Sequence, residues 1–212
     1  FARAHSPLTG PTEGRSPRGG RPSLYFPAGI GAGTCYTSRM ARYDAGNSEV
    51  LVFSFKDGVL AKLAHDLKMH VESFSIDVDD ATKAITATFD ARTVKVVCRR
   101  KDGHDEHGGL GSLELGQIHS NLEKDVLESK KHPEIRFAST EVKPEGDGYR
   151  IRGNLTLHGQ TRSIDTVAKK QGGKLVAEVR IHQPDFGIKP YSAMMGALKV
   201  QADVTVQVSV PA

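Results

Sequence analysis

Two histidines and three carboxylates lie close together in the segment KDGHDEHGG. His104 and His107 stand beside Asp102, Asp105 and Glu106, and imidazole and carboxylate groups are ligands for zinc and similar ions. The flanking glycines favour a mobile, solvated loop, and the spacing matches no strict ligand pattern. We therefore assign no metal site, and keep a metal-dependent enzyme centred on His104 and His107 as an alternative.

The sequence offers no pattern for nucleophilic catalysis. G-x-S-x-G, H-E-x-x-H and the P-loop are missing from it. The DFG at 185–187 has no Gly-rich nucleotide loop with it and predicts a turn at a strand end. His65 and His70 fall on opposite faces of a strand, so they cannot share an ion, but His65 can reach a ligand head group at the end of a barrel. We predict no catalytic residue, no cofactor and no enzymatic activity.

The net charge of +4 comes from the first 39 residues, which carry five arginines and one glutamate. Residues 40–212 are therefore neutral overall, and a neutral domain has no bulk attraction for a phosphate backbone. We predict no nucleic-acid partner. Oligomeric state stays open, with a homodimer among the alternatives.

Residues 1–42 are rich in Pro, Gly, Ser and Arg, and this composition predicts a disordered leader. Because Met40 precedes the first regular pattern, one interpretation places the native start there. The segment 24–36 is interrupted by proline and glycines and does not match an export signal, so we predict a cytoplasmic protein. No stretch reaches the ~20 apolar residues that span a bilayer. Cys35 and Cys98 define neither a disulfide framework nor a zinc site.

Alternation of apolar and polar residues dominates from residue 50 onward and predicts β-strands. It is clearest at 198–210, where Val, Leu and Ala occupy every second position. Short turns such as EGDG and QGG mark antiparallel hairpins. The expected strands cover 50–56, 66–78, 83–90, 92–99, 134–143, 149–158, 161–170, 174–183 and 198–210.

One segment has helical spacing instead. Ile118, Leu122, Val126 and Leu127 predict a helix within 115–131, with Ser120 and Glu123 as a capping box and Pro133 as its end. The pattern for 43–212 thus predicts one all-β domain of about eight antiparallel strands with one short helix, which is the signature of a closed barrel or a sandwich.

Four segments resemble the YceI-like family of bacterial, polyisoprenoid-binding, lipocalin-like barrels. GNLTLHGQTRSI (153–164) is similar to its G-x-L-T hairpin, and HPEIRFASTEV (132–142) to its YPEI strand entry, with His132 where Tyr or Phe is common. PDFGI (184–188) resembles its DFG turn, and LAHDLKMHVESFSIDVD (63–79) its opening strand pair. The resemblance covers roughly 43–210.

This resemblance implies a protein that stores or carries a long apolar lipid, such as a polyprenyl lipid or a quinone tail, inside the barrel. Two departures accompany it: no export signal is evident, and KDGHDEHGGLGSLELGQIHSNLEKD replaces the family's usual segment before the helix. A non-catalytic structural module with a filled core remains an alternative, because periodicity cannot distinguish a filled core from a tunnel. The residues expected to line the cavity are Phe53, His65, Leu67, Met69, Phe89, Val96, Leu122, Phe137, Leu155, Leu157, Val179, Ile181, Val200 and Val204.

Overall fold

The structure is a computed structural model that describes residues 39–58 and 65–212. Most of the predicted leader, and Cys35 with it, lies outside the described residues. The predicted boundary after residue 42 falls within the first strand. Strand β1 (Met40–Asp44) pairs antiparallel with β4, and this backbone pairing draws residues 40–42 into the sheet.

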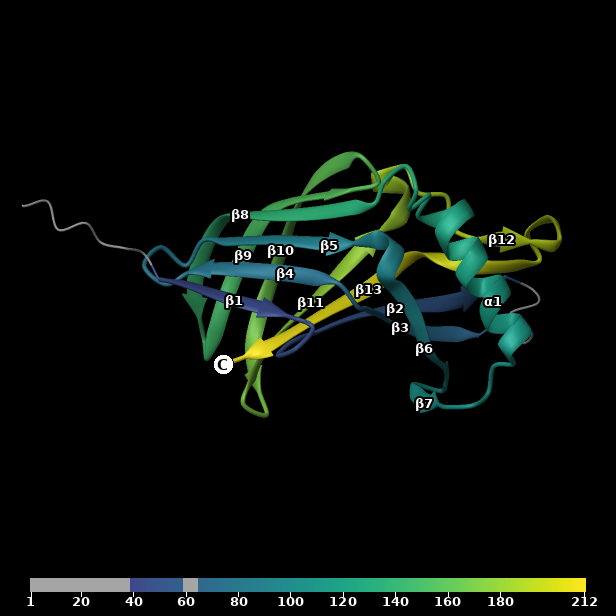
Figure 1. Cartoon of the computed structure of the whole chain (residues 1–212), viewed down its shortest axis with the longest axis horizontal. Coiled ribbons are helices and arrows are strands. Elements are labelled where there is room, and N and C mark those ends of the chain that lie inside the picture. The colour runs from purple at the N-terminus through teal and green to yellow at the C-terminus, as the bar shows by residue number, and fades with distance from the viewer. Residues whose placement is uncertain (1–38, 59–64) are drawn as a thin grey trace, which may run out of the picture. The chain divides into compact units, whose positions relative to one another are not determined.

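The described chain forms one antiparallel sheet, which curls so that α1 lies at one of its ends (Figure 1). The strand order is β1-β4-β5-β8-β9-β10-β11-β13-β2-β3-β6-β7, and β12 pairs with β13. The remaining strands are β2 (Glu49–Asp57), β3 (Asp66–Val71), β4 (Phe74–Asp79), β5 (Ile85–Asp90), β6 (Val94–Lys101), β7 (His104–Glu106), β8 (Glu134–Glu145), β9 (Gly148–Leu157), β10 (Gln160–Gln171), β11 (Lys174–His182), β12 (Ser192–Ala193) and β13 (Leu198–Pro211). Short 3₁₀ turns cover Ala91–Thr93, Gln183–Phe186 and Met194–Gly196.

The all-β antiparallel fold with one short helix is confirmed. The sheet has 13 strand segments rather than about eight, because the strand expected over 66–78 is broken into two and three short strands were not foreseen. Within the described residues, β1 and β7 each pair with one neighbour only and form the two edges of the sheet. No backbone pairing joins these two edges to each other.

One bent hairpin supplies strands to both halves of this sheet. Its first arm is β3 followed by β4, and its second arm is β5 followed by β6. The bend keeps its cross-strand hydrogen bonds: Glu72 N–H donates to the Thr93 carbonyl at 3.1 Å, and Asp90 N–H to the Ser73 carbonyl at 3.0 Å. The β4–β5 half pairs with β1 and β8, whereas the β3–β6 half pairs with β2 and β7. Because each arm of the hairpin is one continuous chain, the bend connects the β4–β5 half of the sheet directly to the β3–β6 half.

Helix α1 (Ser112–Asn121) continues into a π-helical turn (Leu122–Val126), so the predicted helix exists but its ends are wrong. Leu115 N–H already donates to the Gly111 carbonyl, which places the first turn well before Ser120. Ser120 therefore lies inside the helix and caps nothing. The helical segment stops at Val126, before Pro133 acts on it. In the described part of the chain, no helix has the length and apolar character needed to cross a membrane.

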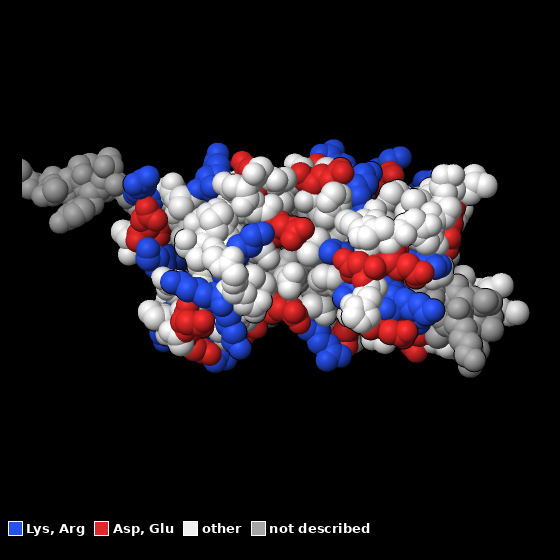
Figure 2. All heavy atoms as spheres, turned by 90° about the horizontal axis from the view of Figure 1, so that it is seen from below, with Lys and Arg blue, Asp and Glu red and all other residues white. Residues whose placement is uncertain are grey.

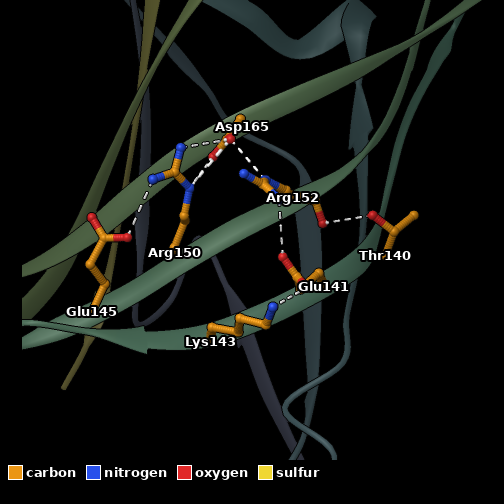
Figure 3. A network of polar contacts seen from close by, with 7 residues as sticks. All are labelled: Thr140, Glu141, Lys143, Glu145, Arg150, Arg152 and Asp165. Carbon is orange, nitrogen blue, oxygen red and sulfur yellow. Dashed lines mark hydrogen bonds and ion pairs between the residues drawn. The ribbon is translucent and has the colours of Figure 1, made fainter.

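The outer face of the sheet is polar and carries charges of both signs. Figure 2 shows Lys and Arg interspersed with Asp and Glu over one face. On β8, β9 and β10, Arg150 and Arg152 both donate to Asp165, while Glu141 and Glu145 accept from the same arginines (Figure 3). The hydrogen bond from Arg150, with a second from Arg152, lowers the pKa of Asp165. Each exposed ion pair of this kind contributes little to the free energy of unfolding, but together the charges fix which face of each strand meets water.

Gly153 in β9 marks a close approach inside the sheet. An added Cβ there would lie 2.5 Å from the Ala138 carbonyl oxygen and 2.5 Å from the Phe137 ring. We expect Gly153→Ala to lower the free energy of unfolding by about 1–3 kcal/mol in urea titrations, because the well-packed wall must shift. In the control Gly116→Ala, the new Cβ in α1 meets nothing within 4 Å. That variant should gain about 0.5–1 kcal/mol from helix propensity, and a Gly153→Ala protein as stable as wild type would contradict the close contact.

Candidate functional site

A cavity of about 740 Å³ lies inside the curled sheet. Eleven strands from β1 to β13 and the helical segment contribute to its wall, and most of the lining side chains are Val, Leu, Ile, Ala, Met or Phe. The volume falls within the range of ~300–1,000 Å³ that is usual for ligand pockets. The inward faces of the strands therefore enclose an apolar space that they do not fill.

The structure brings the predicted lining residues together, with the exception of Phe53 and Val96. This places side chains from distant parts of the sequence around one space. Ligand binding by these residues stays a prediction. The residues that line the cavity are His65, Leu67, Met69, Phe89, Leu122, Phe137, Leu155, Leu157, Val179, Ile181, Val200 and Val204.

The placement of Phe53 in the cavity is wrong. Val52 and Ser54 line the cavity, so Phe53 projects from the other face of β2, where the Arg100 guanidinium lies 4.9 Å from its ring centroid. The segment EVLVFSF is apolar on both faces. Alternation alone therefore cannot choose the inward set, and a choice that is off by one residue reverses the face.

Val96 also fails to reach the cavity. It pairs with Met69 and packs against the buried cluster around that residue. Helix α1 packs on β6 at this point, and the Val96 N–H donates to Nε2 of His119 at 3.0 Å. Val96 thus belongs to the contact between wall and helix rather than to the surface of the cavity.

Polar lining residues gather where α1 meets the cavity. Glu114, Gln117 and Asn121 project from α1, and His65 lies at the start of β3. Nε2 of His65 lies 3.1 Å from Oε1 of Glu114, which links the helix to the sheet. Lys199, at the start of β13, also lines the cavity. This end offers hydrogen-bond donors and acceptors that the aliphatic middle of the cavity lacks.

The cavity extends to the opposite end of the sheet, at the turn between β4 and β5 (Figure 1). Tyr43, Asp80 and Lys83 line it there, together with the last two residues, Pro211 and Ala212. The lining thus runs from one end of the sheet to the other, and the space is elongated.

Sequence reasoning missed the polar residues of α1. Glu114, Gln117 and Asn121 follow helical spacing and share one face, so their pattern was available as a signal. The predicted helix range starts at residue 115 and therefore leaves out Glu114, the first residue of this pattern. Val50 and Val52 also face the cavity and were not predicted to do so, because β2 is apolar on both faces and alternation cannot choose the inward one.

The segment around His104 and His107 is more ordered than the predicted mobile loop, because His104–Glu106 form β7. Two of its three carboxylates are already paired with cations. Asp105 accepts from Lys68 and Arg100, and Glu106 accepts from Arg99. These bonds lower the pKa of Asp105, chiefly through Lys68, and the pKa of Glu106, chiefly through Arg99.

The alternative metal centre is only partly assembled in the structure. The potential ligand atoms of His107, Asp105 and Cys98 lie within 4.8 Å of one another, but His104 belongs to no such group among the described residues. The ammonium and guanidinium groups on Asp105 would oppose a metal cation at this place. Burial is the main cause that raises the pKa of the Cys98 thiol, which disfavours the thiolate that a metal requires.

A family model described as YceI-like domain matches residues 43–212. A UPF0312 protein of Photorhabdus laumondii is 35% identical over 95 residues, which cover 40% of this chain and 48% of the relative. A UPF0312 protein of Pectobacterium atrosepticum is 50% identical over 48 residues, which cover 23% of this chain and 25% of the relative. The matches span about half or less of these curated relatives.

Two solved structures share the fold. The crystal structure of BcnA from Burkholderia cenocepacia has a TM-score of 0.55 and 17% identity, over 80% of this chain and 98% of that one. A polyisoprenoid binding domain from Saccharophagus degradans, described as implicated in plant cell wall breakdown, has a TM-score of 0.51 and 11% identity. That match covers 82% of this chain and 97% of the domain. At such low identity, the likeness establishes the fold alone.

His119 fastens α1 to β6 only while its Nε2 is unprotonated and accepts the Val96 N–H. Burial, and then the charge of Lys95, lowers the pKa of His119 below the ordinary 6.5, while Glu72 opposes this shift. The unfolded chain therefore takes up this proton first as the pH falls. The contribution of His119 to stability is complete above pH 6.5 and is lost as the pH drops through the folded-state pKa.

We expect urea unfolding between about pH 8 and about pH 5 to show this loss in the wild type. In His119→Gln, an amide that does not titrate replaces the imidazole, so this part of the pH dependence should disappear. The same pH dependence in both proteins would contradict the role given to His119.

Proposed function

The chain belongs to the YceI-like domain family, and we propose that it binds a long apolar lipid of the isoprenoid type and stores or carries it. The observation that carries this proposal is the elongated apolar cavity, which reaches from the β4–β5 turn to α1. The likeness to a polyisoprenoid binding domain supports the ligand class. Cytoplasmic location stays a prediction.

The free energy for such binding comes from removing a hydrocarbon chain from water. Each CH₂ group buried is worth roughly 0.8 kcal/mol, so a chain that fills an apolar tunnel is held without any charged contact. The valines of β13, which face Val179 and Ile181 of β11 across the hydrogen-bond register, supply such a surface. An elongated, flexible ligand matches this wall better than a compact polar one.

Both ends of the cavity carry polar residues, but more of them lie beside α1 than at the β4–β5 turn, and this sets the expected direction of the ligand. We place the polar head beside α1, where Gln117 and Asn121 offer amides and His65 pairs with Glu114. Pockets of this kind need only a few such groups to fix orientation. The apolar tail then runs toward the β4–β5 turn.

No acid–base or nucleophilic step enters this proposal. The metal-dependent alternative at His104 and His107 would require Asp105 and Glu106 to leave their arginine and lysine partners. The alternative of a filled core predicts side chains that interdigitate throughout, whereas the structure has about 740 Å³ of space within the sheet. Binding without catalysis is thus the function that the geometry supports best.

Solvent extraction of the purified full chain, followed by mass spectrometry, tests for a retained lipid. We expect a long-chain isoprenoid or a related amphipathic lipid in amounts that approach the amount of protein. Extracts that stay clean after purification from the native host, together with no uptake of added polyprenol or quinone, would contradict the proposal.

A cavity-blocking variant makes the test specific to the interior. Ala177 lines the cavity, whereas its neighbour Val176 does not. Ala177→Trp displaces several methylene groups of a bound chain, and at about 0.8 kcal/mol each its affinity for polyprenol should fall at least ~10-fold. The matched control Val176→Trp adds the same ring outside the cavity and should bind like wild type. Equal affinities of the two variants would place the lipid elsewhere.

A further inference from the structure

Three potential metal ligands that the lipid site does not use meet beside the end of the helical segment. They are Glu128 and His132, from the connection before β8, and His158, from the turn between β9 and β10. Their ligand atoms all lie within 4.8 Å of one another. The rings of His132 and His158 are 4.2 Å apart between centroids. No pattern in the sequence connects these residues, because His158 is far from the other two along the chain.

His158 has a buried nitrogen that lacks a hydrogen-bond partner. The side chain is 13% exposed, and its Nε2 is enclosed without forming a hydrogen bond. This nitrogen lies 3.2 Å from Oε2 of Glu128, but not in hydrogen-bond geometry. A buried nitrogen and a carboxylate oxygen that face each other at this separation can both be satisfied by one cation between them. A spacing near 3.3 Å is also what two ligands of one tetrahedral zinc ion require, at metal–ligand distances of about 2.0–2.1 Å.

Two tight turns hold the ligands in this arrangement. The Glu128 carbonyl accepts the N–H groups of both Lys131 and His132, at 2.7 and 3.0 Å, so this turn brings Glu128 and His132 together. His158 and Gly159 form the two-residue turn between β9 and β10, with φ of 51° and 74°. Glu128 also has a positive φ, of 42°. Two of the three ligands therefore occupy left-handed backbone conformations, where Asn or Gly is more usual.

One oxygen of the Glu128 carboxylate remains available to a cation at this point. Lys131 binds Oε1, which leaves Oε2 directed to His158. A hydrogen bond to one oxygen of a carboxylate, such as that from Lys131 to Oε1, orients the other oxygen toward a metal ion. The group around Cys98 and Asp105 differs, because its carboxylate already holds two cationic partners.

We propose that Glu128, His132 and His158 form a binding site for a divalent transition-metal ion, with Zn²⁺ as the best match. Two imidazoles and one carboxylate are a common three-ligand set for zinc, which leaves a fourth position for water or another ligand. The ion would join the turn after the helical segment to the β9–β10 hairpin. The neighbouring residues Leu127 and Leu157 line the cavity, so the ion would stabilise its wall.

Calorimetric titration of the metal-free full chain with Zn²⁺ tests this site, and Co²⁺ absorption reports the coordination geometry. We expect one site per chain, visible bands of tetrahedral Co²⁺, and a higher melting temperature with Zn²⁺. His132→Phe keeps an aromatic ring but removes a ligand. His158→Asn removes another while giving the turn an Asn-Gly sequence, which favours this turn type.

Loss of a direct ligand should weaken Zn²⁺ affinity at least ~10-fold in each variant, since even changes to the partners of ligands cost 10–100-fold. Without metal, His158→Asn should be as stable as wild type, which separates lost binding from misfolding. The control His104→Gln, His107→Gln removes two histidines outside the cluster and should bind Zn²⁺ like wild type. The proposal would be overturned if the wild-type protein does not bind Zn²⁺, or if His132→Phe and His158→Asn bind Zn²⁺ as tightly as wild type. Neither result bears on lipid binding.

Discussion

An apolar interior that the protein's own side chains do not fill is the constraint on which this structure depends. Protein cores normally pack like organic crystals, and each void forfeits the contacts that its lining atoms would otherwise make. Here the inward valines, leucines and isoleucines surround a space of about 740 Å³. Water finds few hydrogen-bond partners along the aliphatic middle of this space. An apolar occupant would restore the missing contacts, so the same feature that costs stability in the empty sheet would favour binding.

The wall and the helix are stabilised in different ways. The wall is curved by the bent hairpin of β3–β4 and β5–β6, which keeps its hydrogen bonds through the bend and belongs to both halves of the sheet. Helix α1 has no buried residue. It is held by His119 on β6 and by the pair of Glu114 with His65. Elements with few buried contacts open at lower free energy than sheet interiors, and this one lies at the polar end of the cavity.

The cluster of Glu128, His132 and His158 and the apolar cavity share two turns of the chain but differ in polarity. Leu127 and Leu157 line the cavity, and the residue after each, Glu128 and His158, belongs to the cluster. A turn makes this possible because consecutive residues need not follow the alternation of a strand. The wall of the cavity is thus continuous with a polar site that can be studied independently of any lipid.

The sequence by itself determined the longer strands, their antiparallel pairing and most of the inward faces, because alternation fixes which side chains share a face. The valines of β13 and the G-x-L-T hairpin are examples in which the local pattern and the fold agree. It could not orient Phe53, since β2 is apolar on both faces, and it misplaced the helix start, since Ser120 resembles a cap within a helix that begins at Ser112. Only the tertiary structure decided that the inward side chains leave a void, and that His158 meets Glu128 and His132. Both depend on the curvature of the sheet and on long-range contacts, and periodicity along one chain carries no information about either.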